Sequence, residues 1–199
     1  MKFGSIGAGT IGQALGRHIL NAGHDVIFSN SRGPESLAEI VAQLGPRASA
    51  GTVAEAAAAD MVLLAPPWDK VPESVAGLPD WNGRIVIDAT NQFSIATRHI
   101  ADLGKQTGSE YVASLLPGAR IIKALNTLYA PYIAPNPRHD AGRQVLFYTG
   151  DDDDANTQFH ELFEEIGFAP VRIGPLRNGG RLMQMDGGPL SALHALKQD

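Results

Sequence analysis

The segment that most constrains the fold is a glycine-rich turn near the start of the chain, Gly7-Ala8-Gly9-Thr10-Ile11-Gly12. The residues before it, 2–6, have the apolar character of a buried strand. Residues 11–21 carry apolar side chains at helical spacing. A second short apolar run, 25–29, predicts another strand. Strand, glycine turn, helix and strand in this order predict a βαβ unit, which opens a parallel sheet.

The three glycines of this turn have separate physical roles. Gly7 allows the tight turn, Gly9 lets the backbone approach a pyrophosphate, and Gly12 lets the helix pack closely on the strand. The first turn of the helix offers free N–H groups and a partial positive charge to phosphates. We therefore expect Gly7, Gly9, Thr10, Ile11 and Gly12 to bind a dinucleotide, the alternative being a glycine turn without a ligand.

The remaining sequence predicts strands and helices in alternation. Strands are expected at residues 48–50, 61–65, 84–88, 120–125, 144–148 and 170–173, and helices at 34–44, 52–59, 155–166 and 182–196. The fold class is therefore α/β: a Rossmann-type, doubly wound, mostly parallel sheet with a small C-terminal extension. We expect residues 1–127 to form the dinucleotide-binding domain and 128–199 to pack on it or to continue it. Residues 131–143 are expected to form a mobile loop.

Composition narrows the classes of function. The chain has no cysteine, so disulfides, thiolate catalysis and cysteine metal sites are excluded. The net charge of −5 and the lack of a basic run argue against nucleic acid or an anionic membrane as a partner. No apolar stretch has the length of a membrane span, and the N-terminal residues lack the pattern of a signal peptide. The expected location is the cytoplasm, and the expected partner is a small molecule.

The end of the second strand indicates which nucleotide is bound. NAD-dependent enzymes usually carry an acid there for the ribose hydroxyls, but this chain has Asn30 in that place, followed by Ser31 and Arg32. Asn30 would not repel a 2′-phosphate, Ser31 can donate a hydrogen bond to it, and Arg32 can pair with the dianion. The segment therefore predicts NADP(H). The alternatives are a dual-specific site and a polar turn with a solvated arginine.

Three more segments follow predicted strands and should lie at the same edge of the sheet. Because ligands bind beyond the carboxyl ends of parallel strands, we expect these segments to converge on the nicotinamide. Ala65, Pro66, Pro67, Thr90 and Asn91 are expected at the cofactor, and Trp68, Asn126 and Thr127 at the second substrate. Trp68 offers a flat face for a ring, or packs at a helix start. Thr90, Asn91 and Asn126 can bind the carboxamide or substrate, or cap local turns.

Other ionisable residues allow more than one interpretation. Lys123 lies inside an apolar strand, where it reaches the pocket as a cation or extends to water at the strand end. The run 151–154 consists of aspartates and precedes a helix, so we expect helix capping rather than a metal site. His139, in the expected loop, either approaches a substrate or is solvated. No residue is assigned a catalytic role, and no metal site is expected.

Several segments together resemble one family, the NADP-dependent oxidoreductases that use the deazaflavin coenzyme F420, with related dinucleotide-binding enzymes. The resemblance covers nearly the whole chain. It rests on Gly7-Ala8-Gly9-Thr10-Ile11-Gly12, Ser29-Asn30-Ser31-Arg32, Pro66-Pro67-Trp68, Ile122-Lys123-Ala124-Leu125-Asn126-Thr127, Gly150-Asp151-Asp152-Asp153 and Ile173-Gly174-Pro175-Leu176.

This resemblance implies hydride exchange between the nicotinamide and the deazaflavin, and a homodimer or higher oligomer. It also implies that the glycine turn, Ser31 and Arg32 hold NADP, and that Pro66, Pro67 and Trp68 lie beside the nicotinamide. The segment Asp88-Ala89-Thr90-Asn91 differs from the members best known for the deazaflavin reaction and leaves the second substrate open. Two alternatives remain: NADPH-dependent reduction of another acceptor (an imine, ketone, flavin or metal complex), and a non-catalytic NADP sensor.

Overall fold

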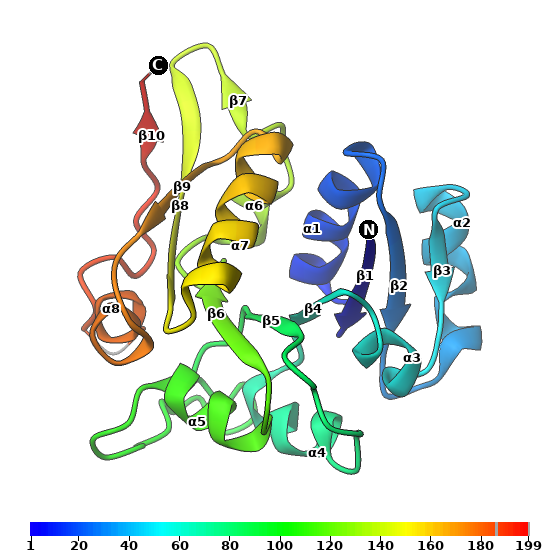
Figure 1. Cartoon of the computed structure of the whole chain (residues 1–199), viewed down its shortest axis with the longest axis horizontal. Coiled ribbons are helices and arrows are strands. Elements are labelled where there is room, and N and C mark those ends of the chain that lie inside the picture. Colours follow the sequence, from blue (N-terminus) through cyan, green and yellow to red (C-terminus); the bar gives the residue numbers. More distant parts are fainter. Residues whose placement is uncertain (186, 199) are drawn as a thin grey trace.

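A computed structural model describes residues 1–185 and 187–198 of the chain (Figure 1). The strands are β1 Lys2–Ile6, β2 Asp25–Ser29, β3 Ala48–Ala50, β4 Met61–Leu64, β5 Ile85–Asp88, β6 Arg120–Ala124, β7 Arg138–His139, β8 Gly142–Gly150, β9 Ala169–Arg172 and β10 Leu196–Lys197. The α-helices are α1 Thr10–Asn21, α2 Ala38–Leu44, α3 Val53–Ala57, α4 Val71–Val75, α5 Gly108–Leu115, α6 Ala130–Ile133, α7 Asp153–Ile166 and α8 Leu176–Met183. Short 3-10 helices occupy Pro34–Leu37 and Trp68–Lys70.

The sheet has the strand order of a dinucleotide-binding fold. From one edge it runs β3-β2-β1-β4-β5-β6, and every pairing in this part is parallel. β8 then pairs antiparallel with β6 and parallel with β9, and β10 and β7 pair antiparallel with β8. After β1 the chain adds β2 and β3 on one side of that strand, and it then returns to add β4, β5 and β6 on the other side. Such a reversal is where open α/β sheets bind ligands, beyond the carboxyl ends of the strands. The expected α/β fold with a mostly parallel sheet is confirmed.

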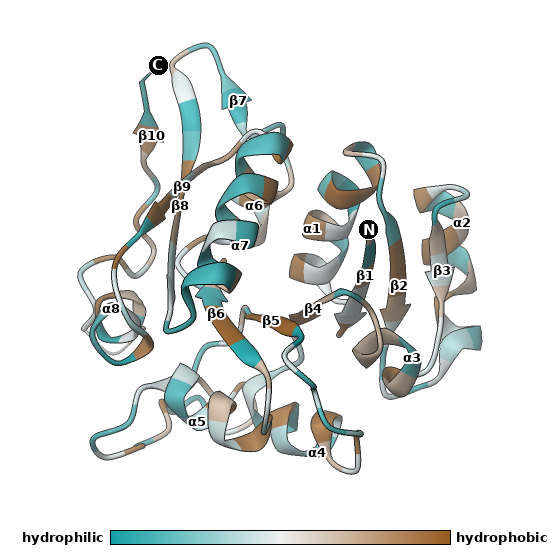
Figure 2. Cartoon of the chain, viewed as in Figure 1, coloured by the Kyte–Doolittle hydropathy of each residue, from teal (hydrophilic) through white to brown (hydrophobic). Residues whose placement is uncertain are grey.

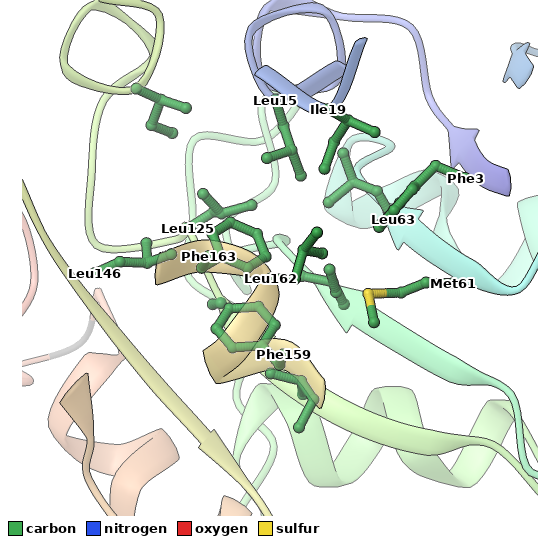
Figure 3. Packing of buried hydrophobic residues seen from close by; sticks show 14 of the residues in the cluster. Phe3, Leu15, Ile19, Met61, Leu63, Leu125, Leu146, Phe159, Leu162 and Phe163 are labelled. Carbon is green, nitrogen blue, oxygen red and sulfur yellow. The ribbon is translucent and has the colours of Figure 1, made fainter. Parts of the chain in front are cut away.

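Helices cover both faces of the sheet, and each face has its own hydrophobic cluster. On one face, α1 and α7 pack over the strands. Figure 3 shows Leu15 and Ile19 of α1 near Phe3 and Leu63, and Phe163 of α7 near Leu125. On the other face, α3, α4 and α5 cover a cluster that includes Trp68, Trp81 and Val112. The strands are buried on both sides, which explains their continuous apolar runs; Figure 2 shows hydrophobic colour along β2 and β5.

The C-terminal part differs most from the expected elements. The helix predicted for residues 182–196 is wrong: α8 begins at Leu176 and ends at Met183. Gly187, with φ of +73°, Gly188 and Pro189 oppose a helix at the centre of the predicted range. The predicted loop at 131–143 contains the end of α6, the short strand β7 and the start of β8. Its mobility stays a prediction.

Three helices of the described residues, α4, α5 and α6, were not expected. α4 and α5 lie on the side of the sheet opposite α1 and α7 (Figure 1). α5 begins with a capping box, in which the hydroxyl of Thr107 accepts from the backbone N–H of Glu110 while the Glu110 carboxylate accepts from the backbone N–H of Thr107. The same arrangement joins Thr52 and Glu55 at the start of α3, within the helix predicted for residues 52–59.

The sheet continues across the expected boundary between residues 127 and 128. β8 is hydrogen-bonded to β6 through the pairs Ile122–Gly150, Lys123–Thr149 and Ala124–Tyr148. The C-terminal strands therefore extend the sheet, and a division into two domains stays a prediction. Among the described residues, no helix combines the length and the apolar character that crossing a bilayer demands.

Candidate functional site: a nucleotide cleft beside a buried lysine

The glycine turn folds as its sequence predicts. Gly7 has φ of +108°, and an added Cβ would lie 2.6 Å from the carbonyl oxygen of Ala65. At Gly12 a Cβ would overlap the carbonyl oxygen of Gly7, so α1 reaches its close approach only with glycine there. At Gly9, by contrast, a Cβ would meet no atom of the described residues within 4 Å. The turn is therefore packed against the protein on two sides and open at Gly9, in front of α1.

The start of α1 suits an anion. The N-cap is Gly9, which has no side chain, so no side-chain cap occupies the first N–H groups of the helix. The first turn contains no acidic residue. Gly9 and Thr10 are exposed, and Ile11 is half-buried. The positive end of the helix dipole therefore faces the open side of the turn without a carboxylate to neutralise it. These residues fit the pyrophosphate of a dinucleotide.

The end of β2 lies beside this turn, since the backbone N–H of Gly7 donates to the carbonyl of Ser29 at 3.0 Å. Asn30 holds the next turn: its Oδ1 accepts from the backbone N–H of Arg32 at 2.9 Å, and its Nδ2 donates to Ser36 Oγ at 2.9 Å. Asn30 therefore has a structural role here. The turn presents Ser31 and Arg32 to solvent, and among the described residues Arg32 has no ion-pair partner.

The segments after β4 and β5 lie beside the glycine turn, at the carboxyl ends of the parallel strands. The backbone N–H of Ala65 donates to Ile6 at 2.9 Å, and that of Ala89 donates to Leu64 at 3.0 Å. Ala65 and Pro66 lie directly against Gly7, and Pro67 is exposed. The structure thus brings the 65–67 segment to the glycine turn, as the sequence suggested.

A buried ion pair joins the ends of β5 and β6. Asp88 and Lys123 are partners in the parallel register, and Lys123 Nζ lies 3.1 Å from Asp88 Oδ2. Asp88 is fully buried and Lys123 is 5% exposed. The same ammonium donates to the carbonyl of Thr90. Of the two interpretations of Lys123, extension to water is therefore wrong.

The Asp88 carboxylate accepts from donors on both oxygens. Oδ1 accepts from the backbone N–H and the hydroxyl of Thr90, at 2.9 and 2.7 Å, and Oδ2 accepts from Ser109 Oγ at 3.1 Å as well as from Lys123. Each oxygen of this carboxylate therefore has two hydrogen-bond donors. Burial lowers the pKa of Lys123 from its ordinary value of 10.5, while the charge of Asp88 opposes that shift. The hydroxyl of Thr90 thus donates to Asp88 of the ion pair and is not available to donate to a ligand.

Asn91 and Asn126 form a second link across β5 and β6. Asn91 Nδ2 donates to the carbonyl of Asn126 at 3.0 Å, and Asn126 Nδ2 donates to Asn91 Oδ1 at 3.1 Å and to the carbonyl of Met183 at 2.9 Å. Leu125, with φ of +67°, turns the backbone between β6 and Asn126. Asn126 Oδ1 and Thr127 Oγ1 are both buried, and neither has a hydrogen-bond partner among the described residues. Asn126 therefore retains an acceptor beside the ion pair.

These two links border a small cavity of about 10 Å³, which has room for about one water molecule. It is lined by Thr90, Asn91, Gln92, Gly108, Ser109, Lys123, Asn126, Gly180, Gln184 and Met185. Thr127 is buried but does not line it. Gln184 and Met185, which follow α8, form part of its wall. Sequence patterns did not point to Asp88, Ser109 or Gln184.

Trp68 lies behind this cavity. It is 8% exposed, and its ring centroid is 5.4 Å from that of Tyr111 with the planes tilted by 45°. A Cβ at Gly108, which lines the cavity, would sit 3.8 Å from the indole. In this conformation the ring packs in the core at the start of a 3-10 helix, which corresponds to the packing interpretation.

The aspartates at 151–154 cap helices and form ion pairs. Asp152 accepts from the backbone N–H of Ala155 at the start of α7, and Asp151 accepts from that of Leu176 at the start of α8, both at 2.8 Å. Asp153 pairs with Arg172, and Asp154 with Arg120. The predicted helix capping is confirmed. His139 is exposed in β7 and does not line the cavity.

A separate hollow of about 230 Å³ contains none of the predicted site residues. It is lined by Tyr148, Asn156, Thr157, His160, Glu161 and Arg172. Tyr148 Oη and His160 Nδ1 lie 3.2 Å apart in it. The glycine turn, Arg32 and the Lys123 cavity are all elsewhere, at the carboxyl ends of the parallel strands.

Comparisons with known proteins agree with this geometry. Residues 2–92 match the family described as NADP oxidoreductase, coenzyme F420-dependent. The chain is 29% identical over 176 residues to "Metalloreductase STEAP3" of Rattus norvegicus, covering 88% of this chain but only 34% of that protein. It therefore spans about a third of the length of this curated relative.

Two solved structures are similar over most of the chain. A hypothetical protein, SMa0349 from Sinorhizobium meliloti, is 40% identical with a TM-score of 0.92, covering 100% of this chain and 96% of that one. A putative F420-dependent NADP reductase from Arthrobacter sp. FB24 is 21% identical with a TM-score of 0.73, covering 90% and 89%. The family match includes the glycine turn and the end of β2, and it relates the chain to the NADP-dependent oxidoreductases of the family described as coenzyme F420-dependent.

Proposed function

We propose that this protein transfers a hydride between NADP(H) and coenzyme F420, with the acceptor site at the ends of β5 and β6. The observation that carries the proposal is the shared edge: the open turn at Gly9, the exposed Arg32 and the Lys123 cavity all lie at the carboxyl ends of neighbouring parallel strands. A dinucleotide bound along this edge spans the distance from a 2′-phosphate group to a hydride acceptor.

Each part of the edge fits one part of NADPH. Gly7, Gly9, Thr10, Ile11 and Gly12 bind the pyrophosphate at the start of α1, and Ser31 and Arg32 bind the 2′-phosphate. Asn30 acts indirectly, because both ends of its amide hold the turn that presents Arg32. Ala65, Pro66 and Pro67 form the wall next to Gly7, and Thr90, Asn91 and Asn126 border the nicotinamide end. The unpartnered Oδ1 of Asn126 fits an amide N–H such as that of the carboxamide.

When bound, NADPH supplies the hydride, and the protein holds the reacting rings in place and excludes water. Trp68 contributes to this through packing, because its ring supports Gly108 from behind. Thr127 is buried next to Asn126 in the turn after β6. The tight cavity implies that Gln184 and Met185 move when the acceptor enters.

The proposal is tested by mixing purified protein with NADPH and oxidised F420 and following both absorbances. Stoichiometric loss of NADPH and of oxidised F420 supports it, and NADH in parallel tests the role of Arg32. FMN, a ketone, a cyclic imine and a ferric chelate are run beside F420. NADPH binding without turnover by F420 would contradict the choice of acceptor.

A second candidate is the reduction of a small imine or ketone. The observation that favours it is the size of the cavity beside Lys123, about 10 Å³, which opens to a small acceptor with less movement than to a three-ring deazaflavin. Turnover of the cyclic imine or ketone without turnover of F420 would select this function. A non-catalytic NADP sensor predicts binding and no turnover with any acceptor.

The homodimer is also a proposal. Large apolar side chains are exposed on the C-terminal segment, including Leu182, Met185, Leu193 and Leu196, with Tyr132 nearby through its stacked contact with His194. A second copy covering them would remove this apolar surface from water. Light scattering after size exclusion should give twice the 21.1 kDa of one chain, and a monomer would contradict the proposal.

A further inference from the structure

The reduction of a C=N or C=O bond, or of a conjugated ring such as a deazaflavin, needs a proton as well as a hydride. NADPH supplies the hydride, so the proton must come from water or from an ionisable side chain in the pocket. Among the described residues that line the cavity, Lys123 is the one with an ionisable side chain. The sequence offered no clear proton donor, and the structure supplies a candidate.

The hydroxyls in the cavity are already committed as donors. Thr90 Oγ1 donates to Asp88 Oδ1 at 2.7 Å, and Ser109 Oγ donates to Asp88 Oδ2 at 3.1 Å. Asp88 itself is fully buried behind them and does not line the cavity. Neither the hydroxyls nor the carboxylate therefore faces an acceptor with an available proton.

Lys123 has a donor to spare. An ammonium has three N–H groups, and two of them are directed to Asp88 and to the carbonyl of Thr90. No described residue accepts from the third, although Lys123 lines the cavity. Burial also lowers the pKa of this ammonium, which makes loss of the proton easier than for a solvated lysine.

We propose that Lys123 is a catalytic residue that protonates the nitrogen or oxygen of the hydride acceptor. In one turnover, the hydride of NADPH forms a C–H bond at the acceptor carbon, and the electron pair of the C=N or C=O bond, or of its conjugated equivalent, moves to the heteroatom. The heteroatom takes a proton from Lys123 Nζ, and the electron pair of the broken N–H bond stays on Nζ. The products are NADP⁺, the reduced acceptor and a neutral lysine, which regains a proton from water.

Asp88 is the positioning residue in this account. It fixes one N–H of Lys123 and keeps the charge of the pair balanced before proton transfer. It is the charged group in contact with Lys123 among the described residues. Thr149 on β8 and Ser109 on α5, which face it from neighbouring elements, are neutral. Arg120, at the other end of β6, pairs with Asp152 and Asp154 instead.

The inference rests on the proposed hydride transfer, and it is tested with two variants of different kind. Lys123→Arg keeps the charge and the donors but holds its proton at any working pH. The double variant Lys123→Met with Asp88→Asn removes both charges, so that no unpaired buried charge opposes folding. Lys105→Met, at an exposed lysine outside the cavity, is the matched control.

Single-turnover reduction of F420, a cyclic imine and a ketone is followed with each protein across pH. We expect the rate of hydride transfer to fall by about 10²- to 10⁴-fold in both Lys123 variants. NADPH affinity, measured by its fluorescence, should be unchanged, and Lys105→Met should behave as wild type. The wild-type rate should fall as pH rises through the pKa of Lys123. This limb should be absent in Lys123→Arg, and side-chain NMR of ¹⁵N-labelled lysine should place the titration of Nζ at the same pH.

The outcomes separate the two levels of the account. Wild-type turnover with an equally fast Lys123→Arg enzyme would overturn the role of Lys123 while leaving the proposed function standing. Tight NADPH binding by wild type with no reduction of any acceptor would overturn both. An Nζ that stays protonated across the limb in the rate profile would also overturn the inference, whatever the rates.

Discussion

Lys123 and Asp88 stand opposite each other in the parallel register of β5 and β6, with Nζ 3.1 Å from Oδ2 and both side chains buried. A buried pair of this kind rarely adds much stability over apolar residues, but breaking it leaves one charge without a partner. We predict that Lys123→Met alone destabilises the protein by about 3–5 kcal/mol. Adding Asp88→Asn should recover much of that loss. Urea unfolding of the two variants measures it, and equal stability of single and double variants would contradict the pairing.

The same lysine gives stability a pH dependence with a defined sign. Burial lowers its pKa in the folded protein, while the unfolded chain keeps the ordinary value of 10.5. Between these two pKa values the unfolded chain binds more protons, so this residue makes the free energy of unfolding rise with pH up to 10.5. The double variant Lys123→Met with Asp88→Asn should lack that rise. Urea unfolding at a series of alkaline pH values tests this, and an identical slope in both proteins would argue against a lowered pKa.

Gly9 and Gly12 should respond in opposite ways to an added side chain. At Gly9 there is open space, so Gly9→Val should cost no more than about 1 kcal/mol of stability. It should nevertheless weaken NADPH binding by more than about 100-fold, equivalent to about 2.7 kcal/mol, because the side chain fills the pyrophosphate position. Gly12→Ala overlaps the Gly7 carbonyl and should destabilise by about 1–3 kcal/mol. Thermal unfolding and fluorescence titration check both, and unchanged NADPH affinity in Gly9→Val would remove the turn from the cofactor site.

Arg32 should select the nucleotide without supporting the fold. Its side chain is exposed, so Arg32→Ala should leave stability unchanged. Loss of its contact with the 2′-phosphate should weaken NADPH binding by about 1.5–3 kcal/mol and leave NADH binding as it is. Arg47→Ala, at an exposed arginine just before β3 and at the opposite end of the strands, is the control. Equal losses for NADPH and NADH would assign Arg32 a general electrostatic role only.

Asn91 and Asn126 should be energetically coupled, because each amide donates to the other residue. In a double-mutant cycle with alanine we expect a coupling energy of about 0.5–3 kcal/mol for unfolding. Asn126→Ala should be the more harmful single change, since it also removes the donor to the carbonyl of Met183. Additive effects would mean that the two residues act independently.

Much of the nucleotide half could be predicted from sequence, for a physical reason. Buried parallel strands read as apolar runs, and the turn at residues 7–12 needs glycine at positions where a Cβ would collide with backbone. These are local requirements, and they leave local signals. The helix α5 carried such a signal as well, the Thr107–Glu110 capping box, which was not used in the prediction.

The acceptor side could not be predicted in the same way. Asp88 and Lys123 are 35 residues apart, and only the register of two parallel strands makes them partners. No turn fixes that register, since a long crossover joins the strands. α8 was misplaced because Gly179 and Gly180 lower its helix propensity, and packing decides instead: a Cβ at Gly179 would lie 2.5 Å from Thr149 Oγ1. Gln184 was missed as a lining residue of the cavity because the predicted helix at 182–196 included it.

The central claim is direct hydride transfer from NADPH to an acceptor at the ends of β5 and β6. It is tested most directly by a single turnover with NADPH carrying deuterium at the transferred position, with mass spectrometry of the reduced F420 and of the reduced imine and ketone. The account predicts deuterium in a reduced acceptor, and its loss from that acceptor when Gly9→Val prevents cofactor binding. Deuterium that remains in the nucleotide with every acceptor, despite tight binding of NADPH, would contradict it.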